Sequence, residues 1–249
     1  MIERPVALVT GAGRNIGREI ALALAASGHA IAVNVRSSVD EGQAVVDAIE
    51  RAGGQALLCP ADVGDRAAVA AMVERIGAAW GRLDVVVNNA AIRREAALAD
   101  LTETDWHDTL RVVLDGAFFC SQAALALLKA SPRGAIVNIG GLTAHTCATH
   151  RVHVVTAKAG LVGLTRALAH DLAPHRITVN CVSPGMIDTL RQAASASAAP
   201  AHHATRSTLL GRRGSAAEVA QAVSYLCGDG ARFVTGQVLH VNGGAYLGG

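Results

Sequence analysis

The segment from Thr10 to Gly17, which reads Thr-Gly-Ala-Gly-Arg-Asn-Ile-Gly, has the residue types of a turn that binds a pyrophosphate. It follows a short apolar run directly and opens an Ala-rich stretch with helical periodicity. Glycines permit a tight turn and a close backbone approach, and a helix N-terminus offers free N–H groups and partial positive charge. The strand, turn and helix context separates such a site from a chance glycine pattern. We therefore predict a dinucleotide site that includes Gly11, Arg14, Asn15, Ile16 and Gly17.

The residues after the next apolar run indicate which dinucleotide is bound. Arg36, Ser37 and Ser38 stand where an NAD-preferring site usually has an acidic residue that holds both ribose hydroxyls. A guanidinium at this place can pair with a 2′-phosphate instead, with Arg14 and the serine hydroxyls nearby. The sequence therefore favours NADP(H) over NAD(H) as the cofactor.

Further short motifs extend along nearly the whole chain. They are Asp62-Val63, Asn88-Asn89-Ala90-Ala91, Val137-Asn138-Ile139, Ala157-Lys158-Ala159-Gly160, Asn180, Ser183-Pro184-Gly185, Thr235-Gly236-Gln237 and Val241-Asn242-Gly243-Gly244. Together with the glycine turn, these motifs resemble the short-chain dehydrogenase/reductase family.

The resemblance implies the other cofactor contacts. In order along the dinucleotide they are Asp62 and Val63 at the adenine, Asn89, Ala90 and Ala91 at its middle, Lys158 at the nicotinamide ribose, and Pro184, Gly185, Ile187 and Thr189 around the nicotinamide amide. Members of the family are usually dimers or tetramers, so a homodimer or homotetramer is expected.

The sequence departs from the family where the family does its chemistry. The usual tyrosine stands four residues before the lysine, the usual serine thirteen before that tyrosine, and an asparagine lies in the long helix. These positions hold Val154, Gly141 and Val113 here. The tyrosine protonates the developing alkoxide, and acid–base help of this kind contributes roughly a hundredfold to ten-thousandfold in rate. Valine and glycine cannot supply it.

The segment from Thr143 to His153 is unusually polar and offers replacements. If the helix that carries Lys158 extends back this far, His150 or Arg151 would share the face of Lys158. We therefore name Lys158, His150 and Arg151 as the catalytic candidates, with His150 or Arg151 as a replacement acid or anion clamp. His153 would point about a quarter-turn away.

Three functions agree with this pattern. The first is an NADP(H)-dependent oxidoreductase that does not use the tyrosine mechanism and acts on an activated C=C, a C=N or an unusual carbonyl substrate, because hydride transfer belongs to the cofactor. The second is a non-catalytic cofactor-binding subunit that pairs with an active relative in a hetero-oligomer. The third is a non-redox lyase or isomerase, since the fold alone does not exclude one.

The elements that position these residues are predicted from periodicity. Short runs rich in Val and Ile alternate with longer Ala-rich helical stretches, which is typical of repeated βαβ units. We expect strands near Val6–Thr10, Ala30–Val35, Ala56–Pro60, Leu83–Asn88, Ala135–Ile139, Ile177–Val182 and Val238–Val241. Right-handed crossovers would make them one α/β, doubly wound Rossmann-type domain, a seven-stranded parallel sheet with helices on both faces.

Two longer segments complete this prediction. A helix is expected from about Thr104 to Leu128, because Thr102-Glu103-Thr104-Asp105 resembles a capping box. Residues 1–249 are expected to form a single dinucleotide-binding domain with a mobile substrate lid at about residues 187–210. Gln192–Pro200 within this lid is almost entirely Ala and Ser, and no third metal ligand accompanies His202-His203, so no metal site is expected.

The composition limits the partners. Hydrophobic residues make up 51% of the chain and aromatic residues 3%, so the core must consist mainly of Ala, Val, Leu and Ile. The net charge is +2 and the basic residues are scattered, so we expect a small-molecule substrate and no nucleic acid. The five cysteines show no paired spacing, which fits a reducing compartment. With no targeting segment or membrane span expected, a cytoplasmic location follows.

Overall fold

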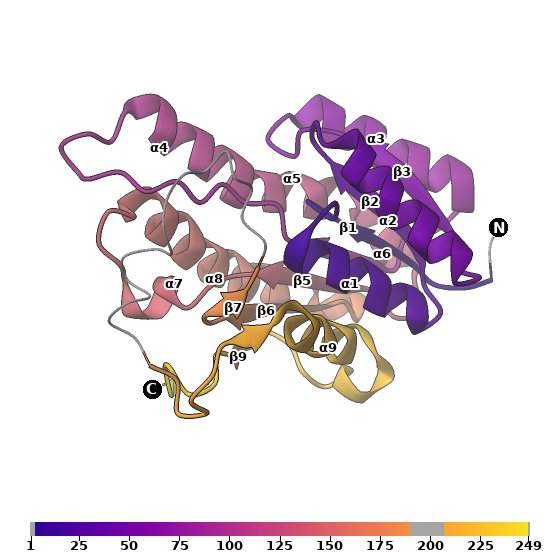
Figure 1. Ribbon diagram of the computed structural model, residues 1–249. Helices are drawn as coiled ribbons and strands as arrows, with labels where there is room; N and C mark the ends of the chain where they lie inside the picture. The colour runs from indigo at the N-terminus through magenta and orange to yellow at the C-terminus, as the bar shows by residue number, and fades with distance from the viewer. Residues whose placement is uncertain (1–2, 190–206, 249) are drawn as a thin grey trace.

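The computed structural model describes residues 3–189 and 207–248, and its centre is a parallel sheet of seven strands (Figure 1). The strands run β1 (Val6–Val9), β2 (Ala30–Val35), β3 (Ala56–Pro60), β4 (Val85–Asn88), β5 (Ala135–Ile139), β6 (Thr178–Pro184) and β9 (Val238–Val241). Their order in the sheet is β3-β2-β1-β4-β5-β6-β9, and every neighbouring pair is parallel. This confirms the predicted doubly wound α/β fold.

Helices cover both faces of the sheet because successive strand residues point to opposite sides. Ala7 and Val9 of β1 pack with one set of helices, and Val6 and Leu8 pack with the other. The first face carries α1 (Asn15–Ala26), α2 (Val39–Arg51) and α9 (Ala216–Cys227). The second carries α3 (Arg66–Trp80), α5 (Gly116–Ala123), α6 (Leu125–Ala130) and α8 (Val152–Leu172).

The long helix predicted from Thr104 to Leu128 is divided in the structure. It consists of α4 (Glu103–Leu110), a π-helical turn η1 (Arg111–Asp115), α5 and α6. The Thr102 hydroxyl caps α4 by accepting a hydrogen bond from the Asp105 N–H at 3.0 Å, as the capping motif indicates. Apolar periodicity does not reveal a wide turn within a helix, so the sequence missed η1. Such turns often lie at functional sites, and this one holds Val113.

Short elements complete the described chain. They are α7 (Thr143–Thr146), the 3-10 turns η2 (Ala173–His175) and η4 (Asp229–Ala231), and the strands β7 (Ile187–Asp188) and β8 (Gly214–Ser215), which pair in parallel. Among the described residues, one helical stretch, Val152–His175, is long and apolar enough to cross a membrane by length and composition alone. This is weak evidence, because core helices pass the same test, and Ala157, Leu161 and Ala169 of this helix are buried in the fold.

The predicted lid is a short strand at its start. Ile187 and Asp188 form β7 by pairing with Gly214 and Ser215 of β8. Arg213 adds side-chain contacts to this pairing: its guanidinium lies 2.5 Å from an Asp188 carboxylate oxygen and donates to the Ile187 carbonyl oxygen at 3.1 Å. The first two residues of the predicted mobile lid are therefore paired in a strand, and the mobility of the lid stays a prediction. Residues 190–206, with His202 and His203, lie outside the described residues.

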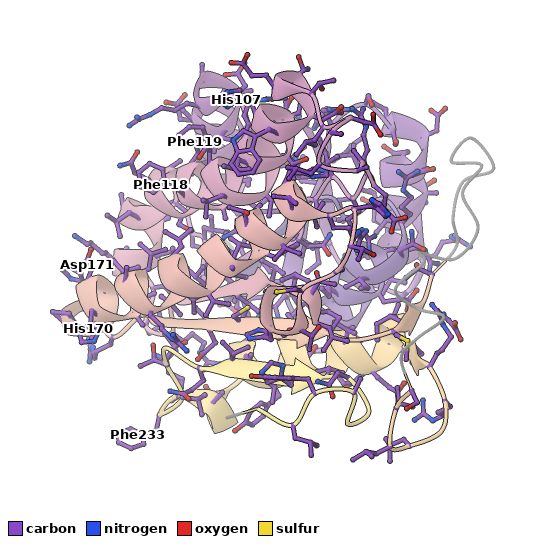
Figure 2. The ribbon with its side chains drawn as sticks, turned by 90° about the vertical axis from the view of Figure 1, so that its left-hand side faces the viewer. His107, Phe118, Phe119, His170, Asp171 and Phe233 are labelled. Carbon is purple, nitrogen blue, oxygen red and sulfur yellow. The ribbon has the colours of Figure 1, made fainter. Side chains whose placement is uncertain are left out.

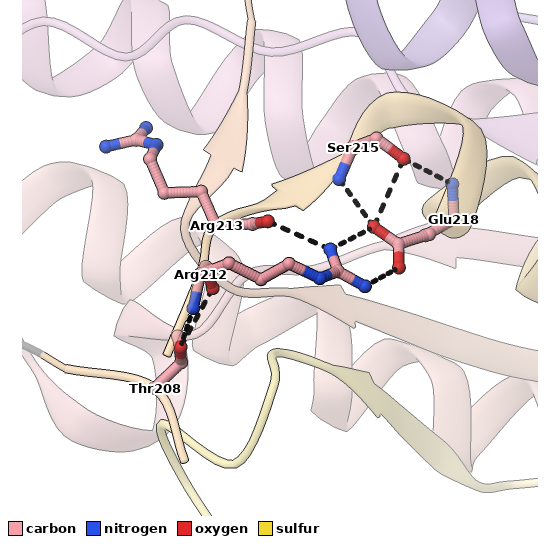
Figure 3. A network of polar contacts seen from close by, with 5 residues as sticks. All are labelled: Thr208, Arg212, Arg213, Ser215 and Glu218. Atoms are coloured by element: carbon pink, nitrogen blue, oxygen red, sulfur yellow. Dashed lines mark hydrogen bonds and ion pairs between the residues drawn. The ribbon is translucent and has the colours of Figure 1, made fainter. Parts of the chain in front are cut away.

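The chain is anchored again just after residue 206 (Figure 3). The Arg212 guanidinium donates to both carboxylate oxygens of Glu218, at 2.6 and 3.0 Å. Glu218 also accepts the Ser215 N–H at 2.7 Å, and the Ser215 hydroxyl caps α9. Thr208 bonds to the Arg212 backbone in both directions. This network fixes the position of Arg213, whose side chain points away from it in Figure 3.

Candidate functional site

The turn between β1 and α1 leaves no room for side chains at its glycines. Gly11 has a φ of +61°, which is in the left-handed region that favours glycine. A Cβ on Gly17 would lie well inside contact distance of the Gly11 carbonyl oxygen and 2.5 Å from Asn89 Nδ2. The first turn of α1 is therefore packed closely against Gly11 and Asn89, and its N–H groups are the kind of donors that bind a pyrophosphate.

Hydrogen bonds from two neighbouring strands hold this turn. The Thr10 hydroxyl accepts the N–H groups of Asn89 and Ala90 at 2.9 and 3.0 Å, and Asn89 Nδ2 donates to the carbonyl oxygens of Thr10 and Gly11. Asn34, at the end of β2, accepts the Gly11 N–H through its side-chain oxygen at 3.3 Å. The turn is thus preorganised by side chains of β2 and β4. The sequence did not indicate the role of Asn34.

We expect Gly17→Ala to damage this turn. The new methyl group must displace backbone or the Asn89 amide, and overpacking of this kind costs about 1–3 kcal/mol of unfolding free energy. NADPH affinity, measured by calorimetry, should fall by at least about tenfold, the equivalent of about 1.4 kcal/mol. Gly163→Ala in α8 is the matched control, because a Cβ there meets nothing within 4 Å and alanine favours a helix. Equal affinity of both variants would refute the close fit of the turn.

A cavity of about 850 Å³ opens in front of the turn, at the carboxyl ends of the strands. The chain order of the strands reverses between β1 and β4, and ligands of doubly wound sheets bind at such a point. Every residue predicted to bind the cofactor lines this cavity. These are Gly11, Arg14, Asn15, Ile16, Gly17, Arg36, Ser37, Ser38, Asp62, Val63, Asn89, Ala90, Ala91, Lys158, Pro184, Gly185, Ile187 and Thr189.

The predicted adenine end carries a fixed carboxylate. Burial raises the pKa of Asp62, but bonds from the Gly64 N–H at 2.9 Å and the Arg111 guanidinium at 3.2 Å outweigh this and hold the pKa below its usual range. Arg36 lies close enough to lower the same pKa further. Arg111 stands on the π-helical turn, so the sequence could not place it here.

Lys158 lies at the other end of the cavity. Its side chain is buried, and its ammonium group donates a hydrogen bond to the Ile139 carbonyl oxygen at 2.5 Å, at the end of β5. Burial, with a smaller contribution from the positive charge of Arg93, lowers the pKa of Lys158 to about 8. The lysine is therefore held in position and can lose its proton near neutral pH.

The three departures from the family lie beside Lys158. Val154 is buried in the cavity wall, one helical turn before the lysine, and Gly141 also lines the cavity. A Cβ at Gly141 would meet nothing within 4 Å. Val113 is buried on η1 next to Val112, which does line the cavity. Among the described lining residues there is no tyrosine, histidine or cysteine.

The structure corrects the expected positions of His150 and Arg151. Helix α8 begins at Val152, so neither residue shares a helical face with Lys158. His150 has a φ of +59°, is exposed and is not among the lining residues, because the chain turns before the helix starts. Arg151 is the residue that precedes the helix, and its buried side chain lines the cavity. His153 is fully buried, within electrostatic reach of Asp105 on α4.

Thr143 and Arg213 are two of the lining residues that the sequence did not assign to the site. Thr143 places a buried hydroxyl-bearing side chain in the wall, two residues after Gly141. Its position inside the polar segment was the available signal. Arg213 also lines the cavity, and it is brought there by the pairing of β8 with β7. No sequence motif marks that pairing.

Other family motifs serve the scaffold in this structure. Asn138 accepts a hydrogen bond from Asn88 at 2.8 Å and donates one to Thr165 at 2.9 Å, so it joins β4, β5 and α8 below the cavity. Asn180 donates to the Val234 carbonyl oxygen and accepts the Gln237 N–H, which fixes the chain before β9. These asparagines therefore position the site without lining it.

The sequence matches the family model described as enoyl-(acyl carrier protein) reductase over residues 11–246. The 3-oxoacyl-acyl-carrier-protein reductase FabG of Staphylococcus aureus (strain Mu50) is 38% identical over 241 residues, 97% of this chain and 98% of that protein. FabG of Escherichia coli (strain K12) is 37% identical over 245 residues, 98% of each chain.

Solved structures are similar to the same extent. A short-chain dehydrogenase from Burkholderia cenocepacia J2315, solved in complex with NADP, has 38% identity and a TM-score of 0.89, with 97% of each chain covered. A dehydrogenase/reductase from Sinorhizobium meliloti 1021 has 35% identity and a TM-score of 0.90, with 98% of this chain and 95% of that chain covered.

Proposed function

Because the chain belongs to the short-chain dehydrogenase/reductase family, we propose that it is an NADP(H)-dependent oxidoreductase with an atypical active site. One observation carries this proposal: a single cavity joins the glycine turn, Arg36 and Lys158, while its wall at Val154 and Gly141 lacks the family's hydroxyl groups. We further propose that residues 1–249 form one domain that works in the cytoplasm.

The residues present fit the proposed cofactor. Gly11 and Gly17, which line the cavity at the start of α1, suit the pyrophosphate, and Arg36, within electrostatic reach of Asp62, suits a 2′-phosphate. Lys158 and the turn at Pro184-Gly185 suit the nicotinamide half. When bound, the cofactor supplies or accepts the hydride. The protein must orient the substrate, exclude water and handle the proton.

Lys158 is the group that we assign to the proton. A general acid works best when its pKa lies near the working pH, and burial brings the pKa of Lys158 to about 8. Its bond to the Ile139 carbonyl oxygen holds the ammonium at the end of β5. A lone lysine gives less acid catalysis than a tyrosine and serine pair, so the substrate must need less of it. We therefore propose an activated C=C, a C=N or an unusual carbonyl substrate. An imine can enter already protonated, and an activated C=C spreads the developing charge.

The test is to follow the absorbance of NADPH with the pure protein over a panel of ketones, enones and imines. We expect oxidation of NADPH with an enone or imine and very slow turnover of simple ketones. NADPH binding without turnover of any compound would support the non-catalytic subunit instead. Conversion of a substrate with no change in NADPH would support a lyase or isomerase.

We expect Arg36→Asp to reverse the cofactor preference. The guanidinium would lose its charge-assisted pair with the 2′-phosphate, which is worth about 1.5–3 kcal/mol, so NADPH affinity should fall by about tenfold or more. NADH affinity should stay level or rise, because a carboxylate can accept the ribose hydroxyls. Calorimetry with both cofactors measures the change.

Arg18→Asp makes the same charge change on α1, at an exposed residue outside the cavity lining, and serves as the control. It should leave the preference for NADPH intact. If the unmodified protein binds NADPH and NADH equally, the assignment of Arg36 is wrong.

We also propose that the chain assembles as a homodimer or homotetramer, with a hetero-oligomer with an active relative as the alternative. Two phenylalanines support it: Phe118 on α5 is partly exposed, and Phe233, between α9 and β9, is fully exposed (Figure 2). Exposed aromatic side chains are typical of protein contacts. Sedimentation of the pure chain distinguishes these proposals: a homodimer or homotetramer forms from this chain alone, whereas a chain that pairs only with an active relative stays monomeric.

A further inference from the structure

We propose that the substrate carries a carboxylate group, which Arg151 and Arg93 bind inside the cavity. This inference rests on the proposed function and specifies the substrate class of the same site. It starts from an excess of cationic side chains at the end of the cavity that holds Lys158. Arg93, Arg151, Arg213 and Lys158 all line this end, and two carboxylates stand against these four cations: Asp188 pairs with Arg213, and Glu95 pairs with Arg151.

The two arginines are brought together by the docking of two loops. The Ala96 N–H donates to the His150 carbonyl oxygen at 2.9 Å, and the Arg151 guanidinium donates to the Arg93 carbonyl oxygen at 3.4 Å. Glu95 lies 3.4 Å from Arg151 Nε and holds that side chain in place. The segment after β4 and the segment before α8 therefore form one arginine-bearing wall beside Val154.

The burial of Arg151 strengthens the interaction of its charge with an anion. Its residue is only 6% exposed, whereas surface arginines are normally well solvated. Arg93 is near enough to Lys158 to lower the pKa of the lysine, so these two positive charges repel each other. An anion placed between them relieves this repulsion, and interactions between charges are stronger where water is excluded.

The cofactor cannot supply that anion. Its phosphates would lie at the glycine turn and at Arg36, at the ends of β1 and β2. Arg93 lies in the loop after β4 and Arg151 in the loop before α8, and Arg93 is within electrostatic reach of Lys158. We therefore assign the negative charge to the substrate.

The chemistry of the wall favours a carboxylate. A guanidinium is a planar fork that pairs with a carboxylate through two parallel hydrogen bonds. Thr143, buried in the same wall, can donate a further hydrogen bond from its hydroxyl group. Helix α8 begins at Val152 with no acidic residue in its first turn, so its dipole favours the same charge. Anchoring one end of the substrate would position its reacting bond beside Lys158, which compensates in part for the missing serine and tyrosine.

The test measures binding with no turnover. The protein is loaded with NADP⁺ and titrated by calorimetry with levulinate, acetoacetate and crotonate, each against its methyl ester. Oxidised cofactor and oxidised substrate cannot exchange a hydride, so the affinities are those of binding alone. We expect at least one acid to bind about tenfold or more tightly than its ester, the value of a charged hydrogen bond.

Two variants test whether Arg151 and Arg93 cause the preference for an acid over its methyl ester. Arg151→Gln should reduce it to less than about threefold, and Arg93→Gln, at an exposed residue, should weaken it by at least about threefold. Arg94→Gln is the control, because Arg94 is exposed, pairs with Asp105 at 2.8 Å and does not line the cavity. It should keep the full preference. If Arg151→Gln does not fold, the Arg93→Gln result decides.

The proposal is overturned if acids and esters bind equally to the unmodified protein, or if both variants keep the preference. Inorganic phosphate binding more tightly than every acid would also overturn it. If the unmodified protein does not bind NADP⁺ at all, the proposed function fails, but the same comparison of acids with esters on the cofactor-free protein still tests the arginine wall.

Discussion

Replacing Gly141 by serine and Val154 by tyrosine together should raise the rate of reduction of a simple ketone by about a hundredfold or more. The unmodified cavity wall has no hydroxyl group at position 141 and no tyrosine to protonate an alkoxide. Residues four apart on a helix share a face, so a tyrosine at 154 would stand beside Lys158. The lysine's positive charge would lower the pKa of the new phenol and bring it closer to neutral pH.

The structure has room for both changes. A Cβ at Gly141 meets nothing within 4 Å, so serine needs no rearrangement there. Val154 stands in the wall of a cavity of about 850 Å³, so a larger side chain can extend into it. The frame that would orient the new groups is already present, because Asn138 and Lys158 both fix the end of β5.

The matched control is Gly141→Ser with Val154→Phe, which adds the same ring without its hydroxyl. The rate of ketone reduction is measured as steady-state oxidation of NADPH with ethyl acetoacetate, an uncharged ketone. It is compared among the unmodified protein, the tyrosine variant and the phenylalanine variant. The tyrosine variant should exceed the phenylalanine variant by most of the expected gain. Equal rates in the two variants, or rapid ketone reduction by the unmodified protein, would show that another group already donates the proton. A histidine would then appear as a pH dependence near neutrality.

The sequence was sufficient for the frame of the site. Strand runs such as Ala30–Val35 are continuous and apolar because both faces of a parallel sheet are buried, and all seven were found. The glycine turn was predicted because its residues are close in sequence and each has a local steric reason. The cofactor-binding residues were predicted mainly through the family resemblance, and all of them line one cavity.

The sequence was not sufficient where tertiary contacts decide. His150 and Arg151 were placed on the lysine helix because helical spacing extends through them, yet the chain turns at His150 with a positive φ. The docking of Ala96 on His150 fixes that turn, and these residues are far apart in sequence. Arg213 reaches the cavity through a two-residue strand pairing that leaves no periodic signal.

Lys158→Met should lower both turnover and NADPH affinity while leaving the fold intact. Methionine is similar in length but has no ammonium group, so the cofactor's ribose would lose a charged donor worth about 1–3 kcal/mol of binding. Turnover of the best substrate should fall by roughly a hundredfold, because no other described lining residue offers a proton near neutral pH. Measuring affinity and turnover separately distinguishes holding the cofactor from donating the proton.

The pH dependence gives Lys158 a signature that a merely structural lysine would lack. Its pKa of about 8 in the folded protein lies below its ordinary value of 10.5, because burial disfavours the charged form. The folded state therefore holds this proton less firmly than the unfolded state. The resulting penalty on stability is full below pH 8 and disappears as the pH rises toward 10.5.

We therefore expect the unfolding free energy of the unmodified protein, measured in urea, to rise between about pH 8 and pH 10.5 relative to Lys158→Met. NADPH affinity should fall over the same range in the unmodified protein, since the donor loses its charge, and stay flat in the variant. Lys129→Met on α6 is the control, because it removes a lysine outside the cavity lining. Parallel pH profiles for the unmodified protein and Lys158→Met would mean that Lys158 is not the titrating group. Unchanged NADPH affinity in a folded Lys158→Met protein would remove it from the cofactor site and leave the nicotinamide half without a charged anchor, which would weaken the oxidoreductase proposal itself.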